Sequence, residues 1–291
     1  MEKFNYKSRV IIEQSLSEED FKDVEKLIEI CNKRHNTDLK LYLDREAENI
    51  TKFLFYDERD LIAYFGMTLS YNVGEAYIWG TINPDCKTKD IFSEIFKSVK
   101  DRCRENNVDT LKFINKRDVT SFREFIIYVG GEEKYSTYEM KFNRKYYKEL
   151  SGECTNLVLS KASLEDLDEI VPIGIEAFGT TEKDERAYNE SNLNNSKYSN
   201  FIGKIHNTTV GIISARIENG EGSIADLAVQ KSYRGKGFGR AILSKTIAYL
   251  LNERIENFTL SVEMENRKAL SIYEDSGFRA VSVSDCYEVK F

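Results

Sequence analysis

Residues 230–240 read QKSYRGKGFGR, and this stretch decides how the fold is interpreted. Residues 224–229 before it have the apolar pattern of a strand, and residues 238–251 after it have the apolar periodicity of a helix. The glycines let the backbone approach a ligand closely with its N–H groups pointing inward. The start of the helix and the nearby cations favour an anion such as a pyrophosphate. These cations are Lys231, Arg234, Lys236 and Arg240.

Other kinds of glycine-rich segment fit this spacing less well. A Walker A loop requires Gly-x-x-x-x-Gly-Lys-Ser/Thr, and a dinucleotide-binding fingerprint requires Gly-x-Gly-x-x-Gly after an early strand. Residues 236–239 begin like an RNA-recognition strand, but the stacking aromatics of that motif would fall at Arg240 and Leu243. The following sequence is also helical rather than extended. A glycine-rich turn that binds no ligand is the remaining alternative.

A second motif follows about thirty residues later, where residues 266–278 read NRKALSIYEDSGF. The alternation of residues 258–264 predicts a half-buried strand before it, and Gly277 closes a short helix over residues 266–276. With both motifs in this order, the chain resembles the GNAT superfamily of N-acetyltransferases. The family patterns are Arg/Gln-x-x-Gly-x-Gly/Ala and Asn-x-x-Ala-x-x-x-Tyr-Glu-x-x-Gly-Phe. The resemblance is strong over residues 157–291 and extends to residues 10–142 only as a fold.

The resemblance implies an acyltransferase in which an amine attacks the thioester of acetyl-CoA directly, in a ternary complex. The backbone of residues 234–239 would hold the pyrophosphate, and residues 227–229 would pair with the pantetheine arm. The N–H of Val229 would polarise the thioester carbonyl. Asn266 would contact the arm from the other side, and no metal is expected. The implied cofactor-binding residues are Leu227, Ala228, Val229, Arg234, Gly235, Lys236, Gly237, Phe238, Gly239, Arg240, Asn266 and Tyr273.

Two side chains are the candidates for catalytic proton transfer. Tyr273 matches the family tyrosine that gives a proton to the departing thiolate, although a helix aromatic can also serve only the core. Glu221 matches a glutamate base in a strand of ribosomal-protein N-terminal acetyltransferases. It also follows Asn219 and Gly220, a hairpin-turn signal, and so could be a solvated turn carboxylate. Asp226, nearer to the cofactor arm, is a weaker candidate for the base.

The chain also repeats itself on the scale of a domain. Four segments recur in the same order at an offset of 146 to 149 residues. They are residues 10–13 and 157–160, 17–21 and 163–167, 77–82 and 224–229, and 138–142 and 287–291. The prediction is an α/β (α+β-like) fold with two tandem GNAT-like domains, each a mixed, mostly antiparallel sheet flanked by helices. The domains are residues 1–148 and 157–291, with a linker at 149–156.

The first half of the repeat lacks the motifs of the second. Residues 87–92, KTKDIF, stand in register with the loop and contain no glycine, and Asp90 brings negative charge to a phosphate site. Ile126 falls near Tyr273, and Gly74 falls near Glu221. The prediction is a degenerate first domain that shapes the acceptor pocket or only covers the second domain. The chain should therefore hold one acyl-CoA.

Composition narrows the classes of function and partner. Of the 291 residues, 41% are hydrophobic and 31% are charged, which is typical of a globular protein. Five cysteines with no Cys-x-x-Cys spacing and two distant histidines disfavour disulfides and zinc and indicate the cytoplasm. A net charge of −7 argues against nucleic acid, and no apolar segment is long enough for a membrane.

The expected partner is therefore an acceptor amine, either a small molecule or a peptide N-terminus. The chain is expected to be a monomer or homodimer. A non-catalytic acyl-CoA-binding regulatory or scaffold protein is the alternative to an enzyme.

Overall fold

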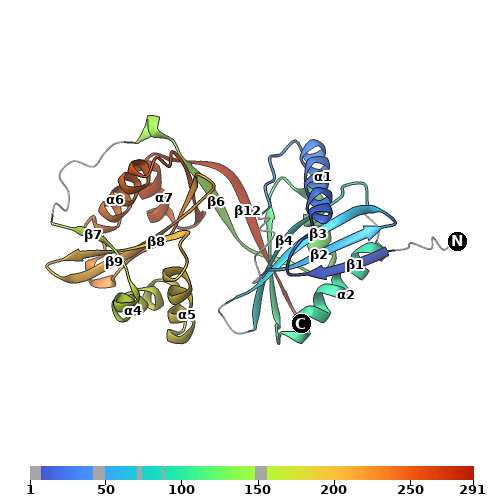
Figure 1. The fold of residues 1–291 in the computed structure, drawn as a ribbon, viewed down its shortest axis with the longest axis horizontal. Coiled ribbons are helices and arrows are strands. Elements are labelled where there is room, and N and C mark those ends of the chain that lie inside the picture. The colour runs from blue at the N-terminus through green and yellow to red at the C-terminus, as the bar shows by residue number, and fades with distance from the viewer. Residues whose placement is uncertain (1–7, 42–49, 71–73, 87–88, 148–155) are drawn as a thin grey trace. The chain divides into compact units, whose positions relative to one another are not determined.

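The computed structural model describes residues 8–41, 50–70, 74–86, 89–147 and 156–291. The chain forms two compact units (Figure 1). Unit 1 comprises Met1–Ser136 and Val283–Phe291, and unit 2 comprises Thr137–Ser282. Each unit is a mostly antiparallel sheet with flanking helices, so the predicted fold class is confirmed.

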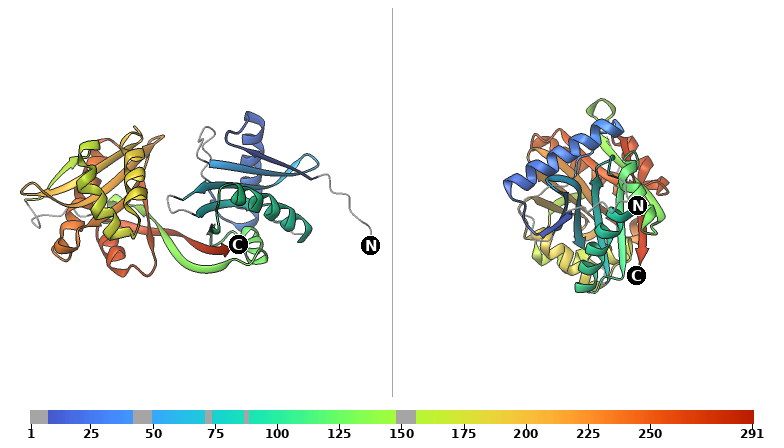
Figure 2. Two further views of the ribbon diagram at one scale, coloured as in Figure 1. Left: turned by 90° about the horizontal axis from the view of Figure 1, so that it is seen from below. Right: turned by 90° about the vertical axis from the view of Figure 1, so that its right-hand side faces the viewer.

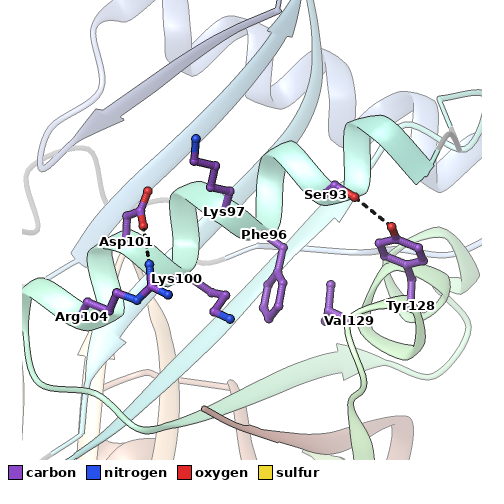
Figure 3. A pocket seen from close by; sticks show the side chains of 8 residues that line it. All are labelled: Ser93, Phe96, Lys97, Lys100, Asp101, Arg104, Tyr128 and Val129. Atoms are coloured by element: carbon purple, nitrogen blue, oxygen red, sulfur yellow. Dashed lines mark hydrogen bonds and ion pairs between the residues drawn. The ribbon is translucent and has the colours of Figure 1, made fainter.

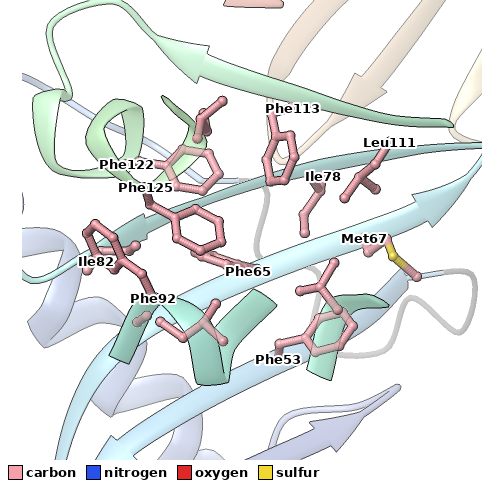
Figure 4. Packing of buried hydrophobic residues seen from close by; sticks show 14 of the residues in the cluster. Phe53, Phe65, Met67, Ile78, Ile82, Phe92, Leu111, Phe113, Phe122 and Phe125 are labelled. Carbon is pink, nitrogen blue, oxygen red and sulfur yellow. The ribbon is translucent and has the colours of Figure 1, made fainter. Parts of the chain in front are cut away.

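Unit 1 has the strand order β1-β2-β3-β4-β5-β12-β6, in which β4 and β5 are parallel. Its strands are β1 (Ser8–Glu13), β2 (Ile50–Asp57), β3 (Asp60–Leu69), β4 (Glu75–Ile82), β5 (Thr110–Lys116), and parts of β6 (Glu132–Phe142) and β12 (Phe278–Lys290). Its helices are α1 (Glu18–His35), α2 (Lys89–Glu105) and α3 (Thr120–Tyr128). Phenylalanine rings fill the core beneath α2 and α3 (Figure 4). The Phe65 and Phe122 rings, for example, lie 5.1 Å apart.

Unit 2 has the strand order β12-β6-β11-β10-β9-β8-β7, in which β10 and β11 are parallel. Its further strands are β7 (Val158–Lys161), β8 (Tyr198–Ile205), β9 (Thr208–Glu218), β10 (Glu221–Val229) and β11 (Asn257–Glu263). Its helices are α4 (Leu167–Phe178), α5 (Glu182–Leu193), α6 (Phe238–Asn252) and α7 (Arg267–Asp275). Short 3-10 turns are η1 (Arg144–Tyr146), η2 (Leu164–Asp166) and η3 (Lys231–Tyr233).

The two faces of the unit 2 sheet have separate cores. On one face, Ile224 and Phe258 of the sheet pack with Ile242 of α6 and Leu270 of α7. On the other face, Ile212 and its neighbours pack against α4. Helix α5 contacts α4 and β8. A residue of β10 therefore faces either α6 and α7 or the side of α4 and α5.

Strands β6 and β12 each belong to both units, and their courses can be followed in Figure 2. Residues 137–141 of β6 pair with β11 in unit 2, whereas residues 284–290 of β12 pair with β5 in unit 1. The bounds of the compact units lie within these two strands, and the domain boundaries at residues 148 and 157 stay a prediction. Alternation identifies a strand but not the sheet that accepts it. The predicted linker, apart from Asn156, lies outside the described residues.

The helix cap, the hairpin turn and the helix end that the sequence predicts are present in unit 2. Ser163 and Asp166 form a capping box before α4. Asn219 and Gly220 have φ values of 51° and 78°, as a tight hairpin between β9 and β10 requires. Gly277, with a φ of 94°, ends the segment of α7 as predicted.

Two further features concern the part of the chain that the structure describes. None of its helices combines the length and apolar character that crossing a membrane requires. Its cysteines are free thiols, and no three metal-ligating side chains gather in it.

Candidate active site

Strands β10 and β11 separate part-way along their length. They pair in parallel from Glu221 to Ile224, whose partners are Asn257 and Leu260. Beyond that point β10 continues against β9 and β11 continues against β6. Within the described residues, the edge of β10 that faces β11 thus has no strand partner from Ala225 onward. An extended molecule can pair with such an edge as an added strand.

A bulge in β10 lies where the strands separate. Ala225 and Ala228 remain paired with β9, whereas Asp226 and Leu227 together face the single residue Ile213. Asp226 has a φ of 58°, in the left-handed region that aspartate tolerates better than most residues. Bulges of this kind re-aim a side chain and are common beside active sites.

The glycine-rich loop connects β10 to the N-terminus of α6, as predicted. Gly235 and Gly237 have φ values of 75° and 83°, which side chains with a Cβ rarely adopt. Gly237 is the N-cap of α6 and gives no side-chain hydrogen bond to the first turn. The N–H groups of that turn have no partner within the helix. A Cβ at Gly235 would meet nothing within 4 Å, so the loop is open to an anion.

Protein groups contact both the backbone and the side chain of Arg234. Its backbone N–H donates to Lys231 O at 3.3 Å, because η3 closes a turn there. Its Nε donates to Val229 O at 2.8 Å, and its guanidinium lies 3.7 Å from Glu176 of α4. Glu176 also accepts from the Lys231 N–H at 2.7 Å. Arg234 and Glu176 thus tie the loop to β10 and α4.

The side chains of Lys236 and Arg240 are also held by protein groups. Lys236 Nζ donates to Ser232 O at 2.9 Å and lies 5.2 Å from the centre of the Tyr233 ring. Arg240 donates to Asp275 at 2.6 Å, which links α6 to α7. Positive charge therefore stays beside the open end of α6, where an anion would sit.

Helix α7 carries the second motif. Asn266 caps it by accepting from the Ala269 N–H at 3.1 Å, which uses its side-chain oxygen and leaves its amide nitrogen as a donor. The Tyr273 ring is partly buried, 6.2 Å from the Phe278 ring. Burial raises the pKa of Tyr273 above its ordinary value, so the hydroxyl keeps its proton at neutral pH. Its oxygen has no hydrogen-bond partner among the described residues.

Glu221 lies before the point where the strands separate, and its role as the base stays a prediction. It is exposed, directly follows the Asn219-Gly220 turn, and pairs with Asn257 where β10 and β11 are still neighbours. At roughly 3.3 Å per residue it lies about 16 Å along the strand from Asp226. Its position beside the Asn219-Gly220 turn agrees with the turn signal in the sequence.

Asp226 lies at the bulge itself, with two partners that sequence reasoning missed. Its Oδ2 accepts from Tyr188 of α5 at 2.8 Å and from Ser214 of β9 at 2.6 Å. Burial and the charge of Asp226 raise the pKa of Tyr188, so this tyrosine stays a donor. No local pattern marks Tyr188 or Ser214, because each meets Asp226 only through the tertiary fold.

Unit 1 lacks both the bulge and the separation at the corresponding place. Its strands β4 and β5 stay paired as far as Trp79 and Ile114, and the register of β3 with β4 is continuous. Trp79 stands where Asp226 stands in unit 2, and its indole packs against Gly66. Asp90 lies in the first turn of α2, whereas residues 87 and 88 lie outside the described residues.

A surface pocket of about 450 Å³ in unit 1 lies between α2 and the end of α3 (Figure 3). Asp101 accepts from Arg104 at 3.1 Å, and Lys100 Nζ lies 5.6 Å from the centre of the Phe96 ring. Because Arg104 and Lys100 face protein groups, we assign the pocket no ligand.

Comparison with known proteins decides the family. The sequence model of the acetyltransferase (GNAT) family matches residues 164–278, which include the loop and α7. An uncharacterised N-acetyltransferase of Methanocaldococcus jannaschii, MJ1530, is 33% identical over 128 residues, which cover 42% of this chain and 78% of that protein. The chain belongs to the GNAT family. It is an acyltransferase, and GNAT enzymes use acetyl-CoA as their cosubstrate.

Two further similarities concern the arrangement of this GNAT protein and its relatives. A tandem GNAT protein from the clavulanic acid biosynthesis pathway aligns over 98% of both chains with a TM-score of 0.71 at 10% identity, which shows the fold alone. This match supports the tandem arrangement predicted from the repeat. N-alpha-acetyltransferase 30 of Xenopus laevis is 31% identical over 83 residues, which cover 27% of this chain and 30% of that protein.

Proposed function

We propose that the chain moves an acetyl group from acetyl-CoA to a primary amine by direct attack in a ternary complex. One observation carries the proposal: the unpaired edge of β10 leads directly into a glycine loop and the open N-terminus of α6. The pantetheine arm of acetyl-CoA is extended and leads to a pyrophosphate. It could pair with the edge of β10 while the pyrophosphate binds at the N-terminus of α6. Within the described residues, only unit 2 combines these features.

The residues of unit 2 fit such a cosubstrate. Residues 227–229 offer backbone groups to the pantetheine arm, and the N–H groups at the start of α6 offer donors to the pyrophosphate. The space beside these donors at Gly235 is open, because a Cβ placed there would meet no atom within 4 Å. Asn266 keeps an amide donor on the other side of the arm.

The chemistry of transfer needs charge stabilisation and proton movement, while acetyl-CoA supplies the activated thioester. The Val229 N–H lies on the unpaired edge and is proposed to stabilise the oxygen on which negative charge develops. The Tyr273 hydroxyl is proposed to protonate the departing thiolate, because burial keeps it in its acid form. The acceptor ammonium must also lose a proton before it can attack.

The acceptor is proposed to be a small-molecule primary amine or a peptide N-terminus. The similarity to N-alpha-acetyltransferase 30 supports the peptide, although it spans less than a third of either chain. A cytoplasmic location and a monomeric or homodimeric state remain predictions. The alternative, an acyl-CoA-binding protein without turnover, is disfavoured by the protonated Tyr273 hydroxyl beside an intact loop.

Release of free thiol from acetyl-CoA by the full chain tests this function. The panel should contain peptides with free N-termini, amino acids, polyamines and aminoglycosides, each beside the same compound with its amine blocked. We expect thiol release that depends on a free amine and stays at the background rate with the blocked partner. Binding of acetyl-CoA with no amine-dependent release across the panel would favour the non-catalytic alternative.

A further inference from the structure

We propose that Asp226 is the catalytic base for the acceptor amine and that the acceptor reaches it from the face of the unit 2 sheet that α4 and α5 occupy. This inference rests on the proposed function and names the residue that prepares the amine for attack. Four observations carry it: the fixed carboxylate, its uncompensated charge, the backbone that presents it, and its absence from unit 1.

The carboxylate of Asp226 is fixed through one of its two oxygens. Oδ2 accepts from the Tyr188 hydroxyl at 2.8 Å and from Ser214 Oγ at 2.6 Å, so donors from α5 and β9 hold it from two directions. Oδ1 has no hydrogen-bond partner among the described residues, and the side chain is partly exposed. A carboxylate held in this way presents one oriented, open acceptor to a proton.

The charge of Asp226 is not neutralised by a protein cation. Its partners are both neutral hydroxyls, and no lysine or arginine lies within ion-pair distance of it among the described residues. The carboxylate itself helps to raise the pKa of Tyr188, so the pair keeps a single negative charge. A site with one negative charge and only hydroxyl donors suits an ammonium group.

The backbone presents Asp226 at the point where the cosubstrate arm is proposed to begin. The bulge places Asp226 directly before residues 227–229, whose edge is unpaired. Leu227 and Val229 face the core of α6, whereas the Asp226 side chain turns to Tyr188 on α5. An amine that approaches from the α5 side therefore meets the base before it reaches the thioester.

Among the described residues, a bulge that presents a carboxylate beside a glycine loop is found in unit 2 and not in unit 1. The corresponding strand of unit 1 has continuous pairing with β3, and Trp79 occupies the place of Asp226. A left-handed φ at a residue other than glycine is unfavourable and persists where the surroundings hold it. Its coincidence with the cofactor edge indicates that the reaction, rather than the fold, requires it.

The proton balance of the step is complete with these residues. The acceptor ammonium gives one proton to Oδ1 of Asp226, which leaves a neutral amine and a neutral carboxylic acid. The amine nitrogen forms a bond to the thioester carbonyl carbon, and the bond from that carbon to sulfur breaks. Tyr273 gives its proton to the thiolate and regains one from the new amide nitrogen. Asp226 then releases its proton to water, so each transfer yields one amide, one thiol and one proton.

The test compares Asp226→Asn with Glu253→Gln in the full chain, with an alkylamine acceptor that the intact protein acetylates. The asparagine oxygen can still accept from Tyr188 and Ser214, so we expect the thermal melting temperature to be kept. The kcat should fall by about 10²-fold to 10⁴-fold, the usual contribution of general base catalysis, with acetyl-CoA affinity unchanged. Glu253→Gln, which removes an exposed carboxylate at the end of α6, should leave kcat unchanged.

Two further measurements separate a base from a structural role. An aromatic amine that is already neutral at the assay pH needs no proton removed first, so Asp226→Asn should lose much less kcat with it. Asp226→Gly suits the left-handed φ, so it should fold, lose kcat on the alkylamine, and regain part of it with added formate.

Three results would overturn the inference. They are full activity of Asp226→Asn on the alkylamine, an equal loss on both amines, or an Asp226→Gly variant that is folded, inactive and not rescued by formate. An intact chain that releases no thiol with any amine would instead overturn the proposed function.

Discussion

A fragment of residues 157–291 is expected not to fold, whereas a fragment of residues 137–282 is expected to fold and melt cooperatively. The first fragment is the predicted second domain, but it lacks the part of β6 that pairs with β11. Met140 and Phe142 of that part are buried in the unit 2 core. The Phe142 ring stacks on Phe258 with centroids 4.3 Å apart.

The expected loss is large compared with the stability of a domain. Truncation of buried methionine and phenylalanine side chains costs about 2–5 kcal/mol each, and a domain is stable by only about 5–15 kcal/mol. Removal of the strand also exposes the hydrogen-bonding edge of β11. The second fragment is the whole of unit 2, and the residues of β12 that it lacks pair with β5 of unit 1.

Circular dichroism during heating distinguishes the two fragments. We expect a cooperative transition for residues 137–282 and none for residues 157–291. A cooperative transition of the 157–291 fragment equal to that of the other would mean that β6 is dispensable to unit 2.

Tyr273→Phe is expected to lower kcat by about 10²-fold while acetyl-CoA affinity stays the same. This is the lower end of what proton transfer contributes, because a thiol with a pKa near 8.5 leaves as a fairly stable anion. The ring contact with Phe278 survives the change, and the hydroxyl has no hydrogen-bond partner among the described residues to lose. Stability should therefore change little.

The pH dependence follows from the direction of the pKa shift. Burial raises the pKa of Tyr273, so the acid form persists until the pH exceeds the ordinary tyrosine value of about 10. Deprotonation of Tyr273 should therefore not lower the kcat of the intact protein at neutral or mildly alkaline pH.

Tyr249→Phe is the matched control, because it removes a hydroxyl at the far end of α6, where Tyr249 meets Ser199. Steady-state thiol release gives both kcat values. An unchanged kcat for Tyr273→Phe at every pH would exclude the acid role.

Sequence reasoning found the parts of the site that are local in the chain. The positive φ of Gly235 and Gly237, the N-cap of Asn266 and the turn at Gly277 all depend on neighbours within a few residues. Spacing and residue type therefore carry enough information to place them. The order of strands and helices around the loop was predictable for the same reason.

The parts that were missed depend on contacts between distant segments. Glu176 meets the Lys231 N–H across 55 residues, and Tyr188 meets Asp226 across 38 residues. Neither helix carries a pattern that marks these side chains as different from other polar residues. The sheet partners of β6 and β12 likewise could not be predicted, because a strand looks the same in the sequence whichever sheet accepts it.

The central claim is that the chain holds one acetyl-CoA, at the loop of unit 2, and calorimetric titration of the full chain tests it most directly. We predict one site per chain, lost in Gly237→Val because a β-branched residue does not suit a φ of 83° at the start of α6. Asp90→Ala, at the corresponding place in unit 1, should keep the site. Two sites per chain, or full binding by a folded Gly237→Val variant, would contradict the account.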